Sequence, residues 1–585
     1  MADIKQDVID MLRELAELTM LDEGDPQSFR VRAYESAQHG IEAHAGDLSP
    51  LSAKELQRIE GVGKSTAEKI RELVEQGRVA KLEALRQQYA PSLVALLRIP
   101  GLGPKAVKRL RAELGVESLA DLERCVTEHK LRELKGFGAK SEDKLAQTLA
   151  RMRQQDTTAR TPISVALPLA ERVLTRMREI PGVSHASFCG SLRRFSETVG
   201  DIDIVVVADN ATQVMETFTK LSVVDHVLAH GETKSSVVTR RGTQIDLRVV
   251  SAPQLGAARL YFTGSKGHNI KLRQRALARG LTLSEYALAR IDDGSIVASE
   301  TEEAIYAALG LPFIAPVLRE DAGEIEAAER GALPRALGPV VGDFHVHSTL
   351  SRDARPSLEE LIEAAKARGY AVLAVTEHAE GVHVGVGREA FIEQHARLRA
   401  LQAQLGDSLV LLHGVELNIG RDGELDYDAE FRRSFDFCLA SVHDHFDLDR
   451  ATQTRRIVRA MQDPSVRMIG HLSARTIGAR PPIDLDLDAV FEAAVQTQTA
   501  LEINGALPRL DLSVEALRRV RKYPVTLVLT SDAHELAELD RVQYATRQAE
   551  RAWVTPESVI NAGSAERLVA WTRQKKPPLR ATLSP

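Results

Sequence analysis

The sequence predicts a multidomain protein with a helical N-terminal part, an α+β middle part and a C-terminal β/α barrel. Residues 1–155 form short amphipathic patterns interrupted by glycine, which is typical of small helical domains. From about residue 160, helical patterns alternate with β-branched strands such as 202–208 and 243–250. After residue 340 an apolar strand, then a His, Asp or Glu, then a helix recur. This rhythm predicts a barrel with its chemistry at the carboxyl ends of the strands. The predicted strands there are 371–376, 409–412, 437–442, 499–503 and 525–529.

Length and composition exclude several classes of protein. A chain of 585 residues with 44% hydrophobic and 27% charged residues has several folded domains and is not wholly disordered. No apolar run approaches the roughly 18 residues of a membrane span, and the first residues lack a basic and then apolar signal. The three cysteines Cys125, Cys189 and Cys438 have no paired spacing. We therefore expect a protein of the reducing cytosol that binds no membrane.

Charge is distributed unevenly along the chain. The net charge is −6, but residues 1–50 hold 4 basic and 11 acidic side chains, whereas residues 51–160 hold 22 basic and 15 acidic ones. A basic segment in an acidic protein is a candidate surface for a polyanion. The alternative is a set of solvated helix faces.

A glycine motif recurs three times in the basic segment. Each copy has an apolar residue, then Gly-x-Gly, then a new helix that carries Lys or Arg. Two glycines let the backbone turn tightly, and the next helix presents free N–H groups and its positive dipole end to an anion. This helix–hairpin–helix arrangement suits a phosphodiester backbone. The residues expected to bind DNA here are Gly61, Gly63, Gly101, Gly103 and Lys105. The third copy, Gly136 and Gly138, is also compatible with a structural turn.

Paired aspartates give the sharpest pattern in the first half of the chain. Asp201 and Asp203 are two apart on a predicted strand and so share one face. Adjacent carboxylates repel unless cations neutralise them, and a third acid, Asp246, begins a later apolar strand. Three carboxylates can hold two Mg²⁺ ions, one of which activates an attacking hydroxyl while the other carries a triphosphate. Upstream, donors for phosphate are expected from Gly190, Ser191 and Arg194. A bare Asp-x-Asp would instead suit two solvated aspartates.

The glycine–serine turn and the aspartates together resemble the nucleotidyltransferase superfamily, and the flanking motifs resemble the family X DNA polymerases, the class of polymerase beta. These motifs are Gly190-Ser191, Gly200-Asp201-Ile202-Asp203, Gly231-Glu232-Thr233-Lys234 and Tyr261-Phe262-Thr263-Gly264-Ser265. The resemblance covers about residues 1–315, including Phe29–Tyr34 and the first two hairpins. It implies that Asp201, Asp203 and Asp246 form the metal triad.

The resemblance also implies roles for residues around the triad. Ser191, Arg194 and Gly200 would bind the triphosphate. Tyr261, Phe262, Gly264 and Asn269 would line the nascent base pair, and Lys234 and Arg273 would contact DNA. An aromatic pair beside a glycine turn can press on a deoxyribose and leave no room for a 2′-hydroxyl. Without the family, Tyr261 and Phe262 would be read as core aromatics.

Lys69 lies where lyase-active members of the family have a Schiff-base lysine. Such a lysine needs a lowered pKa to attack an abasic-site aldehyde. Ser65 replaces a lysine of that pocket, which removes one neighbour that would lower this pKa. Arg30 and Tyr34 lie where a 5′-phosphate would be held. The alternative is an exposed helix lysine.

Histidines mark the second half of the chain, because most of the 17 lie after residue 340. We expect His345 and His347 to share one face of a strand. Imidazole and carboxylate ligands together suit Zn²⁺, Mn²⁺ or Fe²⁺, and nine ligands exceed the needs of one catalytic ion, so two or three metals are expected. The candidate ligands are His345, His347, Asp353, His378, Glu416, His443, His471, Asp532 and His534.

These nine residues resemble the ligand set of the PHP (polymerase and histidinol phosphatase) domain over residues 341–575, which implies a distorted (β/α)7 barrel with a bridging Glu416. The sequence departs from the family pattern in two places. Glu377 stands where an Asp is usual and is expected beside the metals, and His471-Leu472-Ser473 replaces His-Pro-Thr. Arg475 and Arg480 are candidates for orienting a substrate phosphate, with a surface role as the alternative.

The resemblances suggest a division of the chain into domains. We expect a lyase-like helical domain at 1–90, a second helix–hairpin–helix subdomain at 91–155, and a nucleotidyltransferase palm at 156–255. A subdomain that binds the nascent pair follows at 256–315, then a linker at 316–340 that mixes Pro, Gly and charge, and the PHP domain at 341–575.

The function expected from this arrangement, that of the bacterial family X enzymes, is a DNA repair polymerase in the bacterial cytosol or nucleoid. It would fill short gaps by template-directed 5′–3′ synthesis with Mg²⁺ or Mn²⁺, on gapped or primed double-stranded DNA and with dNTPs. The PHP half would be a 3′–5′ exonuclease, 3′-phosphatase or abasic-site endonuclease, in base excision repair or end joining. A monomer is the default expectation.

Three other functions remain open on the sequence. One is a template-independent or RNA-tailing nucleotidyltransferase, against which the hairpins and the segment Tyr261–Ser265 argue. Another is a small-molecule PHP phosphatase with a decayed front half, against which the intact acid triad argues. The third is a repair scaffold without enzymatic activity.

Overall fold

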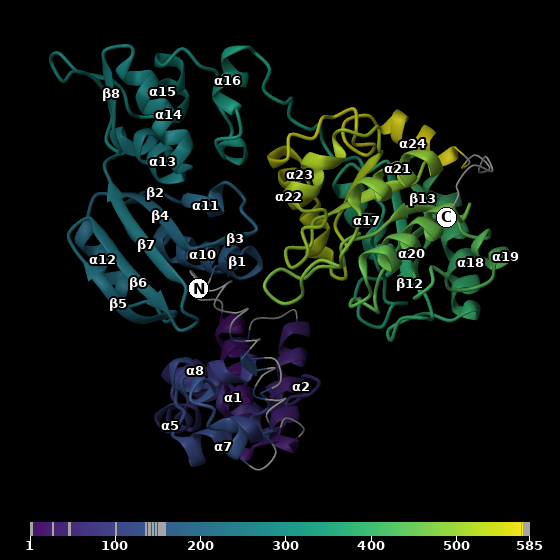
Figure 1. Ribbon diagram of the computed structural model, residues 1–585, viewed down its shortest axis with the longest axis horizontal. Helices are drawn as coiled ribbons and strands as arrows, with labels where there is room; N and C mark the ends of the chain where they lie inside the picture. The colour runs from purple at the N-terminus through teal and green to yellow at the C-terminus, as the bar shows by residue number, and fades with distance from the viewer. Residues whose placement is uncertain are drawn as a thin grey trace. The chain divides into compact units, whose positions relative to one another are not determined.

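The structure is a computed structural model in which the chain divides into two compact units, Met1–Ala159 and Arg160–Pro585 (Figure 1). It describes residues 4–25, 28–44, 48–99, 102–134 and 160–574, together with positions 137, 138, 142, 145, 146, 149 and 576. Within these residues no helix is both long and apolar enough to cross a membrane. The fold class predicted from the sequence is confirmed, and each unit is described by itself.

The first unit is helical and packs around α1. Leu12, Leu15 and Leu18 of this helix are almost completely buried, and its apolar face meets α2, α5 and α7. The helices are α1 (Ile4–Glu23), α2 (Phe29–Ala43), α3 (Ala53–Leu56), α4 (Lys64–Gln76), α5 (Ala80–Gln88), α6 (Pro91–Ala95), α7 (Pro104–Leu114) and α8 (Leu119–Thr127), with short 3₁₀ turns η1 (Leu96–Arg98) and η2 (Leu131–Glu133).

The second unit begins with a five-stranded sheet in the order β2-β4-β7-β6-β5, on which α10 and α12 pack. The central pair β4 and β7 is parallel and the other pairs are antiparallel. The predicted strands 202–208 and 243–250 are β4 and β7. The elements are β1 (Thr161–Pro162), α10 (Ile163–Arg178), β2 (Val183–Phe188), α11 (Gly190–Arg193), β3 (Thr198–Val199), β4 (Asp201–Ala208), α12 (Ala211–Thr219), β5 (Val224–His230), β6 (Lys234–Thr239) and β7 (Gln244–Val250).

A small helical subdomain with a three-stranded sheet follows. Its elements are η3 (Ala252–Gln254), α13 (Leu255–Thr263), α14 (Lys266–Leu277), β8 (Leu281–Leu283), β9 (Leu288–Arg290), β10 (Ile296–Ala298) and α15 (Glu302–Ala308). Part of the segment expected as a linker belongs to this subdomain. It forms η4 (Pro316–Leu318) and α16 (Glu324–Glu329), and Ile325 and Ala328 are buried in the subdomain's core. The composition of 316–340 is that of a linker, but these apolar side chains anchor it.

The C-terminal part is a seven-stranded parallel sheet in sequential order, β11 to β17. Val346 bridges Ala533 in parallel, and the His347 amide donates to the Ala533 carbonyl at 2.9 Å, so the first and last strands meet in a nearly closed barrel. Helices α17, α18, α20 and α21 lie around the strands (Figure 1). The strands are β11 (Gly342–Asp343), β12 (Val372–His378), β13 (Val410–Asn418), β14 (Phe437–Ser441), β15 (Val466–Ile469), β16 (Ala500–Asn504) and β17 (Leu527–Thr530). The helices are α17 (Leu358–Ala367), α18 (Arg388–Leu405), α19 (Ala429–Arg432), α20 (Arg450–Gln462), α21 (Leu487–Thr497), α22 (Val514–Val520), α23 (Val542–Arg551) and α24 (Ala565–Arg573), with η5 (Leu536–Arg541).

One detail of the barrel differs from the prediction. His345 and His347 do not lie on a strand, because β11 ends at Asp343. They follow it in an extended segment that pairs with the barrel only through the bridge at Val346. The i, i+2 spacing nevertheless brings both rings to the same site, since both side chains are fully buried there.

Candidate active sites

The three predicted aspartates meet at the centre of the five-stranded sheet. Asp203 and Asp246 are register partners on the parallel strands β4 and β7. One carboxylate oxygen from each of the three aspartates lies within 4.8 Å of the other two. Each side chain is half-buried, so all three carboxylates remain open to a ligand. This spacing and the all-oxygen donor set suit Mg²⁺ or Mn²⁺.

Burial and mutual repulsion raise the cost of charge at this site. Burial, and then the charges of Asp201 and Asp246, raise the pKa of Asp203 to about 7. Burial and Asp246 also raise the pKa of Asp201. A divalent cation beside Asp201 and Asp203 would stabilise their charged forms, which favours a metal site over a solvated acidic strand.

The turn before α11 requires glycine at position 190. Gly190 has φ +62°, and a Cβ there would lie 2.4 Å from Oδ2 of Asp203. The preceding Cys189 amide donates to the Asp203 carbonyl at 2.7 Å. The backbone of the turn therefore touches the acid triad, and α11 carries Ser191 beside it.

Arg194 is engaged by two groups in this structure. Its Nε donates to Oε1 of Glu320 at 3.0 Å, and its Nη1 donates to the carbonyl of Thr263 at 2.5 Å. The guanidinium also lies 3.3 Å from the position that a Cβ on Gly264 would take. Arg194 thus joins the Gly190 turn to the segment with the aromatic pair. Gly200, also predicted to bind phosphate, is exposed just before β4.

Arginines cover the aromatic pair. Tyr261 and Phe262 make an edge contact, with ring centroids 5.0 Å apart. Arg273 lies over the Tyr261 ring at 5.1 Å, and Arg248 lies over the Phe262 ring at 4.6 Å. Asn269 donates to the Tyr261 carbonyl at 2.7 Å. Both rings are only half-buried, unlike the core aromatics of the alternative interpretation. Lys234 lies exposed at the start of β6, opposite Arg248 in register.

Two of the three glycine hairpins begin a helix as predicted. Gly63 and Gly103 are the N-cap residues of α4 and α7, and a Cβ on Gly61 would lie 2.3 Å from the Ser36 carbonyl oxygen. Lys105 is exposed in the first turn of α7. Gly101 and Gly136 lie outside the described residues, whereas Gly138 is described and accepts a hydrogen bond from the Glu142 amide.

Lys69 lies in a partly enclosed position on α4. Its Nζ donates to the Ser65 hydroxyl at 2.7 Å and lies 5.9 Å from the centroid of the Tyr34 ring. Burial lowers the pKa of Lys69, and Arg30 contributes in the same direction. Ser65, which replaces the family's lysine, therefore orients this amine by accepting a hydrogen bond from it. Arg30 is exposed near the same side chain.

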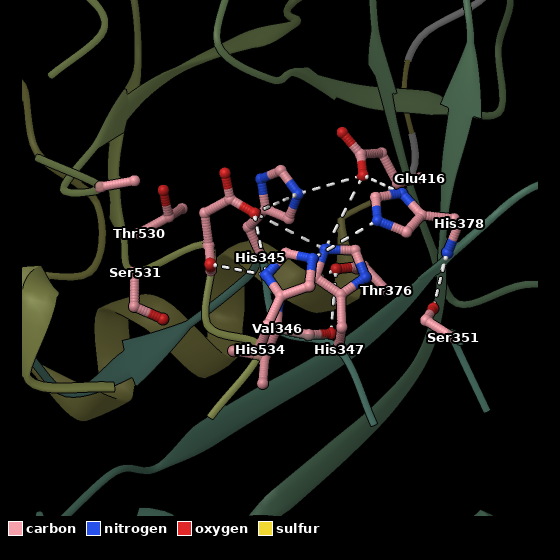
Figure 2. Close-up of polar contacts among 12 residues, drawn as sticks. His345, Val346, His347, Ser351, Thr376, His378, Glu416, Thr530, Ser531 and His534 are labelled. Carbon is pink, nitrogen blue, oxygen red and sulfur yellow. Dashed lines mark hydrogen bonds and ion pairs between the residues drawn. The ribbon is translucent and has the colours of Figure 1, made fainter. Parts of the chain in front are cut away.

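All nine predicted ligands gather at the ends of the barrel strands, and Figure 2 labels His345, His347, His378, Glu416 and His534 among them. Four overlapping groups have donor atoms within 4.8 Å of one another: His347, His378 and His534; His345, His471 and Asp532; His345, His347 and Glu416; His378, Glu416 and His443. Asp353 joins them, with Oδ2 at 3.4 Å from His378 and 3.5 Å from His534.

Glu416 lies at the centre of the cluster. Its Oε2 is 2.8 Å from His378 and 3.3 Å from His345, while its Oε1 is 3.0 Å from His471 and 3.3 Å from His443. Figure 2 shows the rings of His345 and His378 beside this carboxylate. A carboxylate whose two oxygens face different groups of imidazoles suits a bridge between metal ions.

Whether metal ions fit this cluster can be judged from its buried nitrogen and oxygen atoms that have no hydrogen-bond partner. Within the described residues, polar atoms of five ligand histidines and Oε2 of Glu416 are buried and make no hydrogen bond. Such atoms are costly unless a ligand satisfies them. Burial would lower the pKa of His345, but neighbouring carboxylates, above all Asp532 and Glu416, raise it well above its usual value. The donor set therefore fits borderline divalent ions such as Zn²⁺, Mn²⁺ or Fe²⁺.

Comparisons with known proteins identify the family to which the chain belongs. Family models match for a helix-hairpin-helix domain at 3–79, a SAM-like helix-hairpin-helix tandem at 93–151, a DNA polymerase beta thumb at 258–320 and a PHP domain at 343–506. The DNA polymerase/3′-5′ exonuclease PolX of Bacillus subtilis (strain 168) is 34% identical over 574 residues, which is 97% of this chain and 99% of that protein. The chain belongs to the family X DNA polymerases that carry a PHP domain.

Other relatives cover the barrel alone. A probable phosphatase of Aeromonas salmonicida is 28% identical over 39% of this chain and 91% of its own length. The probable phosphatase YcdX of Escherichia coli is 27% identical over 37% of this chain and 89% of its own. Relatives of the PHP part of this family X chain therefore occur without a polymerase part that matches this chain.

Several buried residues that orient the ligands of this PHP domain were not predicted from the sequence. Glu502 on β16 accepts from Nδ1 of His345 at 2.6 Å and from the Thr530 hydroxyl at 2.6 Å. Asp343 accepts from the His345 and Ser531 amides, each at 3.3 Å. Such carboxylates fix the orientation and basicity of a ligand imidazole. An acid inside an apolar strand, as in Leu501-Glu502-Ile503, was the signal available for the first of them.

Glu377 lies beside the ligand cluster and contacts it through serine side chains. Its buried carboxylate accepts from the hydroxyls of Ser348 and Ser351 and from Nε2 of Gln394. Ser351 in turn accepts from the His378 amide at 3.2 Å (Figure 2). Glu377 therefore shapes the segment that leads to Asp353 and does not lie among the metal ligands.

Arg475 and Arg480 do not reach the ligand cluster. Arg475 donates to Glu197 and to two backbone carbonyls, while Arg480 donates to the Ala474 carbonyl and stacks on Phe446. Arg509, and not Arg475 or Arg480, lies beside the ligand cluster. Its Nε is 3.5 Å from Asp532, and its side chain is 26% exposed, so a positive charge faces solvent beside the ligands.

Proposed function

We propose that this family X enzyme fills short gaps in DNA at the aspartate site and removes nucleotides 3′ to 5′ at the PHP site. The observation that carries the proposal is the presence of two complete and chemically different ligand sets on one chain. The similarity to the Bacillus polymerase and exonuclease extends over both sets, at 34% identity. The intact set of three clustered carboxylates, in which burial and then the charges of Asp201 and Asp246 raise the pKa of Asp203 to about 7, argues against a decayed polymerase half.

At the first site, Asp201, Asp203 and Asp246 would hold Mg²⁺ or Mn²⁺. When bound, these ions favour ionisation of the primer 3′-hydroxyl and neutralise the triphosphate. The triphosphate is bound by Ser191, Gly200 and Arg194. Arg194 would release Glu320, its present partner, to bind the phosphates. The half-buried rings of Tyr261 and Phe262 restrict the sugar, and Gly264 and Asn269 fix the turn between them and the nascent pair.

At the second site, the nine barrel ligands would hold two or three ions, which supply Lewis-acid stabilisation of a phosphoester when bound. Glu416 keeps the imidazoles at fixed positions, and Glu502 and Asp343 hold His345 from behind. Arg509 orients the scissile phosphate from the solvent side.

Further roles follow from the helical unit and the composition. Gly61, Gly63, Gly103 and Lys105, together with Gly101, bind the DNA backbone, as Lys234 and Arg273 do in the second unit. Lys69, beside Tyr34 and Arg30, attacks abasic sites as a lyase. We place the enzyme in the bacterial cytosol as a monomer, in base excision repair or end joining.

The test uses 5′-phosphorylated DNA with a one-nucleotide gap and an end-labelled primer, with Mg²⁺ or Mn²⁺ and with or without dNTPs. We expect Asp203→Ala to abolish extension but keep primer shortening, and His345→Ala to do the reverse. If the wild-type chain neither extends nor shortens the primer with either metal, the proposal is refuted.

A second candidate function rests on the phosphatase relatives. Because they cover only the PHP part, this part is also a candidate 3′-phosphatase. A primer with a 3′-phosphate, incubated without dNTPs, separates the two activities. Loss of the phosphate at unchanged primer length indicates a phosphatase, whereas a shorter product indicates an exonuclease. Ribonucleotides in place of dNTPs test the RNA-tailing alternative.

A further inference from the structure

The turn that follows α11 is held by residues of the PHP domain. Glu197, three residues after Arg194, receives Nη1 of Arg475 at 2.8 Å and Nε2 of Gln548 at 2.7 Å. The Glu197 side chain is 22% exposed and that of Arg475 is 10% exposed, so this ion pair is largely shielded from water. Burial would raise the pKa of Glu197, but Arg475 outweighs it and lowers this pKa.

Apolar packing accompanies these polar contacts. Phe195 is 1% exposed and stacks on Tyr544 of α23, with ring centroids 5.7 Å apart. Leu510 of the PHP domain is buried in the core of the five-stranded sheet. Gly478 has φ +79°, and a Cβ there would lie 2.7 Å from Pro162 of β1. The interface is therefore closely packed, and it is centred on the turn that carries the phosphate-binding residues.

One carboxylate oxygen links this interface to Arg194. Oε1 of Glu320 accepts from Nε of Arg194 at 3.0 Å and from Nη2 of Arg551 at 3.2 Å. Arg551 also donates to the Phe195 carbonyl and the Ser196 hydroxyl, each at 3.3 Å. The exposed fractions of Glu320, Arg194 and Arg551 are 20%, 14% and 13%, so solvent screens their interactions only in part.

Two guanidinium groups that share one carboxylate oxygen weaken each other's attraction to it. A triphosphate must draw Arg194 away from Glu320, and this costs less while Arg551 neutralises part of the carboxylate charge. We propose that Arg551 of the PHP domain is a positioning residue of the polymerase site, which keeps Arg194 available for the triphosphate through Glu320. This inference rests on the proposed polymerase function.

The consequence is a set of opposed effects on nucleotide affinity. Arg551→Ala leaves Glu320 to hold Arg194 alone, so we expect the KM for dNTP to rise about three- to tenfold with little change in kcat, since only part of one charged hydrogen bond changes strength. Glu320→Gln removes the competing charge and lowers this KM. In the double variant, Arg551→Ala has no further effect, because the two residues act through one interaction.

The experiment measures single-nucleotide insertion into gapped DNA by the full chain over a range of dNTP concentrations. The primer carries a 3′-terminal phosphorothioate linkage so that shortening does not contribute. Arg547→Ala is the matched control: it removes the same charge from the same helix, but Arg547 contacts the Phe195 ring, at 5.6 Å, and not Glu320. Arg551→Lys keeps a charge near Glu320 and should restore most of the affinity.

The outcomes separate the inference from the proposed function. No insertion by the wild-type chain refutes the polymerase function itself. Insertion by the wild type with the same KM in Arg551→Ala and Arg547→Ala refutes the inference. A loss of kcat and affinity together in Arg551→Ala, which Glu320→Gln does not remove, indicates that Arg551 only supports the fold of the turn and also refutes it.

Discussion

Replacing Gly190 by alanine adds one methyl group at the point where the α11 turn meets the acid triad. The new Cβ would lie 2.4 Å from Oδ2 of Asp203, whereas ordinary contacts begin at 3.4 Å. Either the turn or the carboxylate must therefore move by about 1 Å to restore a normal contact. Metal sites tolerate deviations of about 0.2 Å in ligand distance. The change in geometry thus exceeds what the site can absorb.

The expected magnitude has two parts. Left-handed φ strains an alanine by about 1–2 kcal/mol, which lowers the free energy of unfolding. Misplacement of a reacting group by about 1 Å costs about 100-fold in rate. We therefore expect the Mg²⁺-dependent insertion rate of Gly190→Ala to fall about 100-fold, while 3′–5′ shortening by the PHP domain stays at the wild-type level because Gly190 is remote from the barrel ligands in sequence and contacts none of them in the described structure.

The assay is single-turnover insertion on gapped DNA, with urea unfolding measured in parallel. Gly242→Ala is the matched control, since Gly242, in the turn between β6 and β7, also has a positive φ, +80°, but no atom lies within 4 Å of the added Cβ. It should share the loss of stability and keep the insertion rate. Equal insertion rates in the two variants would show that contact with Asp203 does not matter and would refute the reasoning.

Four further predictions concern other residues. Glu377→Gln places an amide donor against hydroxyl donors, so it should lower the free energy of unfolding, measured in urea, by about 1–3 kcal/mol. In the gap assay it should reduce primer shortening but not nucleotide insertion. Burial lowers the pKa of His413 to about 3 from 6.5. Between these two values the unfolded chain binds a proton at His413 that the folded chain does not bind. The free energy of unfolding therefore falls as the pH drops below about 6.5. At pH 5 the loss in the free energy of unfolding is roughly 2 kcal/mol. In urea unfolding, His413→Phe should remove this loss, and His383→Phe, at an exposed histidine, should not. Chelation should lower the thermal midpoint, with recovery on adding Mn²⁺ in the wild type and a much smaller recovery in Glu416→Gln. Lys69→Ala should abolish the borohydride-trapped complex with abasic DNA while gap filling persists.

Sequence patterns predicted the two ligand sets because most ligands lie at or near one end of a recognisable strand. Asp203 and Asp246 stand at the starts of β-branched runs, and the sheet pairs those runs in register. Most barrel ligands follow buried apolar strands, so their position at one end of a parallel sheet follows from the strand rhythm. Their mutual distances then depend only on the closure of the barrel.

Residues that support the sites were not predictable in this way. Glu320 lies in a segment whose composition is that of a linker, and its two partners, Arg194 and Arg551, are 126 and 231 residues away in sequence. Glu502 supports a histidine 157 residues earlier. No local period encodes such pairs, because they arise only when separate domains and strands pack together.

The two ligand sets differ in a way that separates the two activities chemically. The palm offers three carboxylates and no imidazole, which favours hard ions that bind weakly and exchange quickly, such as Mg²⁺. The barrel offers six imidazoles, five of them around Glu416, which favours borderline ions held more tightly. Brief treatment with a chelator followed by Mg²⁺ alone should therefore restore insertion before it restores shortening. Equal recovery of both activities with Mg²⁺ would contradict this difference in donor chemistry.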